Sequence, residues 1–103
     1  MKQLIALGTL LFTFNAAAGC PSAVPARTPE IPNGAAASEQ SMFDAMAAVR
    51  SYVQTIEAYL DCRDFALSDR RYDELGDKAS DAAGAYNREL VRFQQRDEAL
   101  AQN

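Results

Sequence analysis

The sequence predicts an all-α fold: an antiparallel two-helix hairpin with an N-terminal polyproline II arm packed on the first helix. Three observations predict it. Residues 42–62 carry two apolar stripes at helical spacing, residues 69–101 carry a third stripe, and four prolines fall within residues 21–32. A helix with two apolar faces needs two partners, so one face is expected to meet the second helix and the other to meet the arm.

Residues 1–18 have the pattern of a secretory signal peptide. Lys2 supplies the positively charged start, residues 4–14 form the apolar core, and three alanines at 16–18 form a small-residue cleavage site. The apolar run is too short to cross a bilayer. We therefore expect export to the periplasm, a mature chain that begins at Gly19, and no membrane span once the signal is removed.

The mature chain is acidic. Loss of Lys2 with the leader leaves nine basic residues against fourteen acidic ones, a net charge of about −5. An acidic surface argues against nucleic acid and against anionic membranes as partners. The expected partner is therefore an unknown protein or a second copy of the chain.

Residues 19–37 form the predicted proline-rich arm. Prolines spaced three or four residues apart favour the extended polyproline II conformation, and Asn33-Gly34 is a turn signal. Residues 21–32 would span roughly 37 Å at ~3.1 Å per residue, and a helix over residues 42–62 roughly 31 Å at ~1.5 Å per residue. A reversal at Asn33-Gly34 would therefore lay the arm antiparallel along this helix.

Five side chains are expected to hold the arm in place. Tyr52 and Tyr59 lie on the second stripe of the first helix and would stack on prolines of the arm. The prolines expected in this packing are Pro25, Pro29 and Pro32. Composition alone would favour a disordered linker, but the second stripe favours a docked arm.

Cys20 and Cys62 are the two cysteines of the chain, and in an exported protein they predict one disulfide. It would close a loop of about 43 residues and contribute roughly 4 kcal/mol in the chain-entropy model. The alternative is lipidation of Cys20 after residues 17–19, which are suitably small. That alternative lacks the usual large aliphatic residue three places before the cysteine, and it leaves Cys62 as a free thiol.

Residues 38–103 form the predicted hairpin, with the first helix at 38–64 and the second at 69–101. The two stripes are expected to meet in a coiled-coil-type seam in which large residues face small ones at the centre. Six pairs are expected: Leu60 with Leu75, Ile56 with Ala79, Val53 with Ala82, Val49 with Tyr86, Met46 with Leu90, and Met42 with Phe93.

Local signals mark the helix starts and one close contact. Ser38 is the expected N-cap of the first helix, and Ser68 or Asp69 that of the second. Gly76 is expected to lie near Tyr59 and to give its ring clearance.

The sequence predicts no catalytic residue, no cofactor and no metal site. Four aspartates recur every four residues from Asp69 to Asp81, but without the loop and glycine placement of a calcium site. The chain has no histidine, no C-x-x-C pair and no glycine-rich phosphate loop. We therefore expect that the protein is not an enzyme.

Two cysteines and an Ile-Pro-x-Gly-Ala element are the most specific parts of a longer pattern. It comprises Cys20, then Pro29-Glu30-Ile31-Pro32-Asn33-Gly34-Ala35, then Met42, Val49, Tyr52 and Tyr59-Leu60-Asp61-Cys62. Across most of the mature chain, this pattern resembles small exported proteins of Gram-negative bacteria, a family without an assigned activity. The resemblance therefore implies export and carries over no catalytic role. The arm on a helix also resembles the pancreatic polypeptide hormones, in architecture alone.

These expectations converge on a non-catalytic interaction or structural module of the periplasm or envelope. Two alternatives stay open. The first is an outer-membrane lipoprotein anchored at Cys20. The second is a small acidic inhibitor or immunity-type binder, whose acidic helix face would meet a basic partner.

Overall fold

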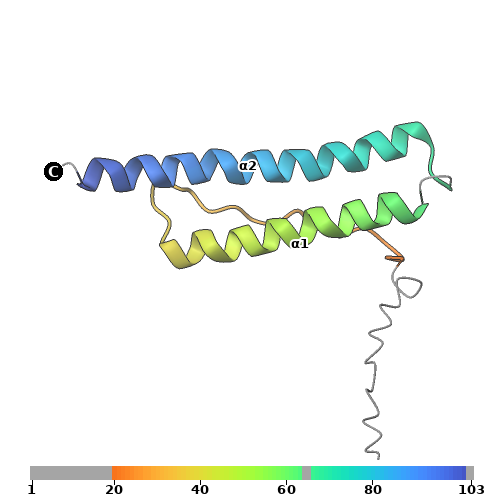
Figure 1. Ribbon diagram of the computed structural model, residues 1–103, viewed down its shortest axis with the longest axis horizontal. Helices are drawn as coiled ribbons and strands as arrows, with labels where there is room; N and C mark the ends of the chain where they lie inside the picture. The colour runs from red at the N-terminus through yellow and green to blue at the C-terminus, as the bar shows by residue number, and fades with distance from the viewer. Residues whose placement is uncertain (1–19, 64–65, 102–103) are drawn as a thin grey trace, which may run out of the picture.

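The computed structural model describes residues 20–63 and 66–101 (Figure 1). Helix α1 is Glu39–Arg63 and helix α2 is Asp69–Ala101, and the two pack against each other in antiparallel directions. The predicted all-α hairpin is therefore confirmed. The predicted signal peptide, residues 1–18, lies outside the described residues.

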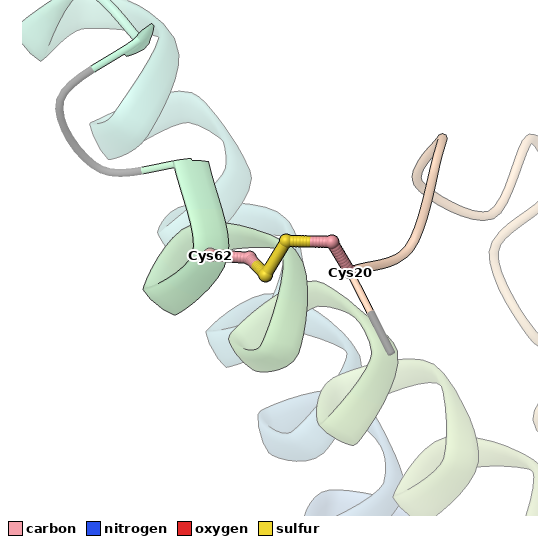
Figure 2. The surroundings of a disulfide bond; sticks show 2 residues. All are labelled: Cys20 and Cys62. Atoms are coloured by element: carbon pink, nitrogen blue, oxygen red, sulfur yellow. A yellow bond between two sulfur atoms is a disulfide. The ribbon is translucent and has the colours of Figure 1, made fainter. Parts of the chain in front are cut away.

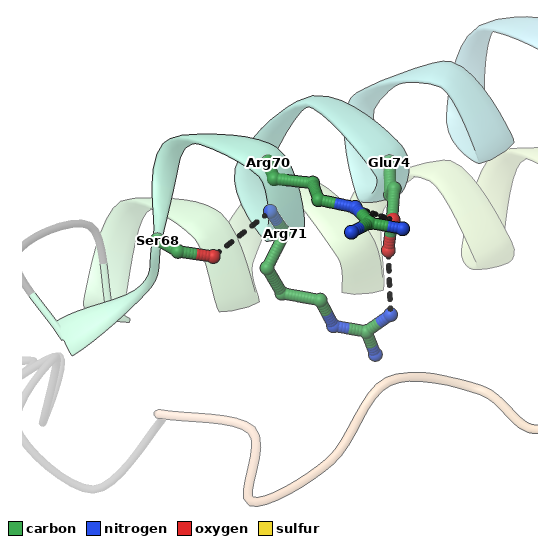
Figure 3. A network of polar contacts seen from close by, with 4 residues as sticks. All are labelled: Ser68, Arg70, Arg71 and Glu74. Carbon is green, nitrogen blue, oxygen red and sulfur yellow. Dashed lines mark hydrogen bonds and ion pairs between the residues drawn. The ribbon is translucent and has the colours of Figure 1, made fainter.

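Serine side chains cap both helices. The backbone N–H of Ser41 donates to Ser38 Oγ at 3.0 Å. The backbone N–H of Arg71 donates to Ser68 Oγ at 3.2 Å (Figure 3). Each serine satisfies one of the amide groups that a helix start leaves without a partner. Local sequence therefore determines where both helices begin.

The core consists of two clusters along the seam. The cluster near the turn joins Tyr52, Ile56 and Leu60 of α1 to Leu75, Ala79 and Ala82 of α2. The cluster at the open end of the hairpin joins Met42, Ala45 and Val49 to Tyr86, with Leu90 and Phe93 packed against it. Ile56 and Leu75 are the most deeply buried, at 1% and 0% exposure. Full burial of such a side chain contributes roughly 1.5–3 kcal/mol.

The arm covers both helices, beyond the expected contact with α1. Val24 packs against the cluster near the turn, while Ile31 and Ala37 pack against the cluster at the open end. Figure 1 shows the arm running back along the helix pair from the start of α1. It therefore lies over the groove between the helices and adds apolar side chains to both clusters.

Gly34 brings the arm into backbone contact with α2. It is buried, and a Cβ atom built on it would overlap the carbonyl oxygen of Glu89 and lie 3.0 Å from the backbone nitrogen of Phe93. Its φ is not positive, so a left-handed conformation is not what requires glycine here. Glycine is required because two backbones approach too closely for a side chain.

Arg96 fastens the same end of the arm to α2. Its Nη1 donates to the backbone carbonyl oxygen of Ala37 at 2.8 Å, and its guanidinium lies 4.7 Å from the centre of the Phe93 ring. A charge-assisted hydrogen bond is roughly twice as strong as a neutral one. Arg96 therefore holds the junction between the arm and α1 against the C-terminal half of α2.

The two glycines of α2 have different surroundings from those of Gly34. A Cβ on Gly76 would meet nothing within 4 Å, so the expectation that Gly76 gives Tyr59 clearance is wrong. A Cβ on Gly84 would lie 3.6 Å from Nη1 of Arg88, an ordinary contact. Alanine therefore fits both helical positions without displacing any neighbour.

We expect Gly34→Ala and Gly84→Ala to shift stability in opposite directions. Gly34→Ala forces the arm away from the backbone of α2 and should lower the free energy of unfolding by about 1–3 kcal/mol. Gly84→Ala, the matched control, should raise it by up to about 1 kcal/mol through helix propensity alone. Urea unfolding followed by circular dichroism measures both, and equal stability of wild type and Gly34→Ala would contradict the close approach.

Candidate functional site

A disulfide joins the first described residue of the arm to the last turn of α1 (Figure 2). Its partners are Cys20 and Cys62, as predicted, with their Cα atoms 5.6 Å apart and a sequence separation of 42. Cys20 is exposed and Cys62 is half-buried. The arm is therefore attached covalently at one end and held by Gly34 and Arg96 at the other.

Tyr52 is the tyrosine that contacts the middle of the arm. It is 6% exposed, and it lines a shallow groove together with Pro25 and Pro29. Ala48 lines the same groove and leaves room for the arm backbone beside the ring. The structure thus brings three of the predicted arm-packing residues together.

The other two predicted arm-packing residues lie at separate places. Pro32 lines a second shallow groove together with Ala45 and Ala48 of α1. Tyr59 is half-buried against the cluster near the turn, and its ring lies 5.4 Å from the guanidinium carbon of Arg63. The aromatic face of Tyr59 is thus used in a cation–π contact within α1.

The side of α2 that faces the arm carries charge. A groove of about 810 Å³ between the arm and α2 is lined by Lys78, Asp81 and Arg88, with Gly84 among its other lining residues. Glu89 lies on this side as well, since its carbonyl oxygen meets Gly34. Charges of both signs therefore surround this groove, and the hydroxyl-bearing side chains of Thr28 and Ser80 line it as well.

On the opposite side of the hairpin, all the described residues that line the groove between the helices belong to α1 or α2. This groove has a volume of about 400 Å³. Val49 and Tyr86 form its floor, because both belong to the core cluster at the open end. The remaining lining residues are Met46, Arg50, Val53, Gln54, Ala83 and Asn87. We call this side of the hairpin the open face.

Charge is absent from the open face of α2 between residues 76 and 90. Ala83 and Asn87 line its groove, and helical spacing places Gly76 and Leu90 on the same side. The five charged residues of this segment lie elsewhere on the helix. Three line the arm groove, Glu89 contacts the arm at Gly34, and helical spacing places Asp77 on the side of Asp81. The two sides of the hairpin therefore differ in the chemistry that they offer to a partner.

The described residues contain neither a cluster of three metal-ligand side chains nor a helix that could cross a membrane. Across residues 20–63 and 66–101, no three Cys, Asp or Glu side chains converge on one point. Neither α1 nor α2 combines the length and the apolar character needed to cross a bilayer. The open face is thus the feature of this part of the chain that sequence reasoning missed. The sequence feature that could have indicated this face is the position of Met46 and Val53 at the edge of the first apolar stripe.

Removal of the disulfide should release the arm and weaken the fold. We expect the double variant Cys20→Ser, Cys62→Ser to lose roughly 4 kcal/mol of unfolding free energy, because the unfolded chain regains the freedom of a long loop. Amide hydrogen exchange should accelerate most in residues 21–37, whose contacts depend on the tether. Urea midpoints and exchange rates that match those of the oxidised wild type would show that the arm holds itself without the bond.

Comparison of the chain with protein-family models, with curated proteins and with solved structures returns no match. We therefore infer the function from the residues and the geometry of this chain alone.

Proposed function

We propose that the protein is an exported, non-catalytic interaction module that works in the periplasm or envelope of a Gram-negative bacterium. The leader-like residues 1–18 support export. The disulfide between Cys20 and Cys62 supports an oxidising compartment, where such bonds persist. The apolar floor of the open groove supports binding.

The open face is the observation that carries this proposal. One groove of the hairpin is occupied by the arm, and the other keeps an apolar floor and a polar rim. Burying apolar surface contributes about 25 cal/mol per Å², so a partner that covers Met46, Val53 and Ala83 gains affinity there. Arg50, Gln54 and Asn87 at the rim supply polar groups that orient the partner. An apolar centre with a polar rim is the usual organisation of a protein–protein interface.

The disulfide also bears on the lipid-anchored alternative. A diacylglyceryl group is attached through the same sulfur atom of Cys20 that forms the bond to Cys62. One sulfur cannot carry both groups, so the alternatives differ in mass and in thiol content.

Export with the disulfide formed has a direct test. We expect the full chain, expressed in a Gram-negative bacterium, to enter the periplasmic fraction as a species that begins at Gly19. Mass spectrometry after iodoacetamide treatment should find no alkylated cysteine before reduction and two after it. Retention in the cytoplasm, or a diacylglyceryl group on Cys20 with one alkylated thiol, would contradict the proposal.

The location of the binding surface is tested by photo-crosslinking in the exported protein. A photoreactive residue at Gln54, on the rim of the open groove, should give discrete adducts upon irradiation of intact cells. The matched control places the same residue at Asp77, on the charged side of α2 where no partner is expected. Equal yields at the two sites, or reproducible turnover of a substrate by the purified protein, would overturn the proposal.

A further inference from the structure

The open face of α1 carries Arg50 and Glu57, two charges of opposite sign that its own chain does not pair, and Asp61 follows Glu57 one helical turn later. Arg50 lines the open groove, and Glu57 follows it by two helical turns on the same side. Neither has an oppositely charged residue three or four positions away on α1. Among the described residues neither joins an ion pair, whereas Glu74 contacts Arg70 and Arg71 at 3.1 and 3.6 Å (Figure 3).

The spacing of these two charges suits a second copy of the chain. Seven residues correspond to about 10 Å along a helix, which is too far for Arg50 and Glu57 of one copy to meet. Consider a second copy whose open face covers the first with its helices antiparallel. The two-fold axis then lies in the interface, perpendicular to the helices, and passes between Val53 and Gln54. It places each Arg50 opposite Glu57 of the other copy. In such a symmetric interface the contact occurs twice.

The same axis brings together the uncharged parts of the two α2 helices. Val53 packs against the core cluster that contains Ala82, so the axis crosses α2 close to Ala83. The residues around this crossing are small or uncharged: Gly76, Ala79, Ala83 and Asn87. Small side chains let two helices approach closely, and the absence of charge removes the repulsion that an acidic chain would otherwise meet. The face is therefore complementary to itself in both size and charge.

The area available matches what a stable dimer needs. Helix α1 has 25 residues and a length of about 37 Å. Two adjacent helices with their side chains are about 20 Å wide, so the open face measures on the order of 700 Å². Stable interfaces bury about 800 Å² on each partner. Pairing about Val53 lies near the midpoint of α1 and so overlaps the two copies over most of its length.

We propose that two copies of this protein pair through their open faces into an antiparallel four-helix bundle, with the arms on the outside and Arg50 of each copy bound to Glu57 of the other. This proposal rests on the proposed function as an interaction module and names the partner as a second copy. The apolar floor at Val49 and Tyr86, the rim charges and the small residues of α2 are then all buried by one symmetric contact.

Sedimentation equilibrium of the oxidised mature protein, residues 19–103, tests the pairing with charge reversals. Wild type should be a dimer at micromolar concentration. Arg50→Glu and Glu57→Arg should each raise the dissociation constant by about 100-fold, because each places like charges opposite one another twice. The double variant should restore the wild-type dimer, since the same pairs form with their signs exchanged. Arg88→Glu, an equal change of charge on the arm side, is the matched control and should dimerise like wild type.

Several outcomes would overturn the proposed dimer. They are a monomeric wild type, single variants that dimerise as well as wild type, and a double variant as weak as the single ones. Arg50 and Glu57 are exposed, so each variant should keep the wild-type circular dichroism spectrum, which separates lost pairing from lost folding. A monomeric protein whose Gln54 crosslinks to a different protein would refute self-pairing and leave the interaction function standing. A dimer that stays in the cytoplasm would support self-pairing and contradict the proposed function in the periplasm or envelope.

Discussion

The disulfide between Cys20 and Cys62 ties the outer end of the arm to the far end of α1, and the course of the arm depends on this tether. Residues between the tether and the turn at Asn33 form no regular secondary structure, so few backbone hydrogen bonds hold them. Their order depends on side chains such as Val24 and Ile31, which pack against the two core clusters.

The opposite end of the arm is fixed by geometry. Gly34 lies against the backbone at Glu89, and Arg96 binds the carbonyl oxygen of Ala37 one residue before the cap of α1. These contacts join the arm to α2, whereas the disulfide joins it to α1. A chain of this size has a small core, and an arm fastened to both helices enlarges that core and limits how far the helices can separate.

The position of the arm makes the two sides of the hairpin unequal. Lys78, Asp81 and Arg88 line the groove beside the arm, while the groove on the other side has an apolar floor. A helix pair with one covered groove can associate through the other without competing with its own arm. This inequality supports a role in binding, and the unpaired charges Arg50 and Glu57 on the uncovered side suit a symmetric partner.

The sequence by itself determined the two helices and the cap of the first, and it favoured the pairing of the two cysteines over lipidation of Cys20. These structures follow from local or countable features: the apolar spacing, a serine before each helix and the presence of only two cysteines. Such features depend on residues close together in the sequence, so they can be recognised without knowledge of the fold. The sequence also predicted the seam between the helices. Ile56, Leu75 and Tyr86 belong to apolar stripes that have few other ways to be buried.

Tertiary structure alone decided where the arm lies and what it leaves uncovered. Asn33-Gly34 indicated a turn, but the requirement for glycine comes from the backbone of α2, more than fifty residues away in the sequence. Gly76 was expected to make room for a ring and has open space around it. The surroundings of both glycines depend on how the arm and the two helices are rotated and shifted relative to one another. No periodicity within one segment encodes that placement, because it results from the packing of all three segments together.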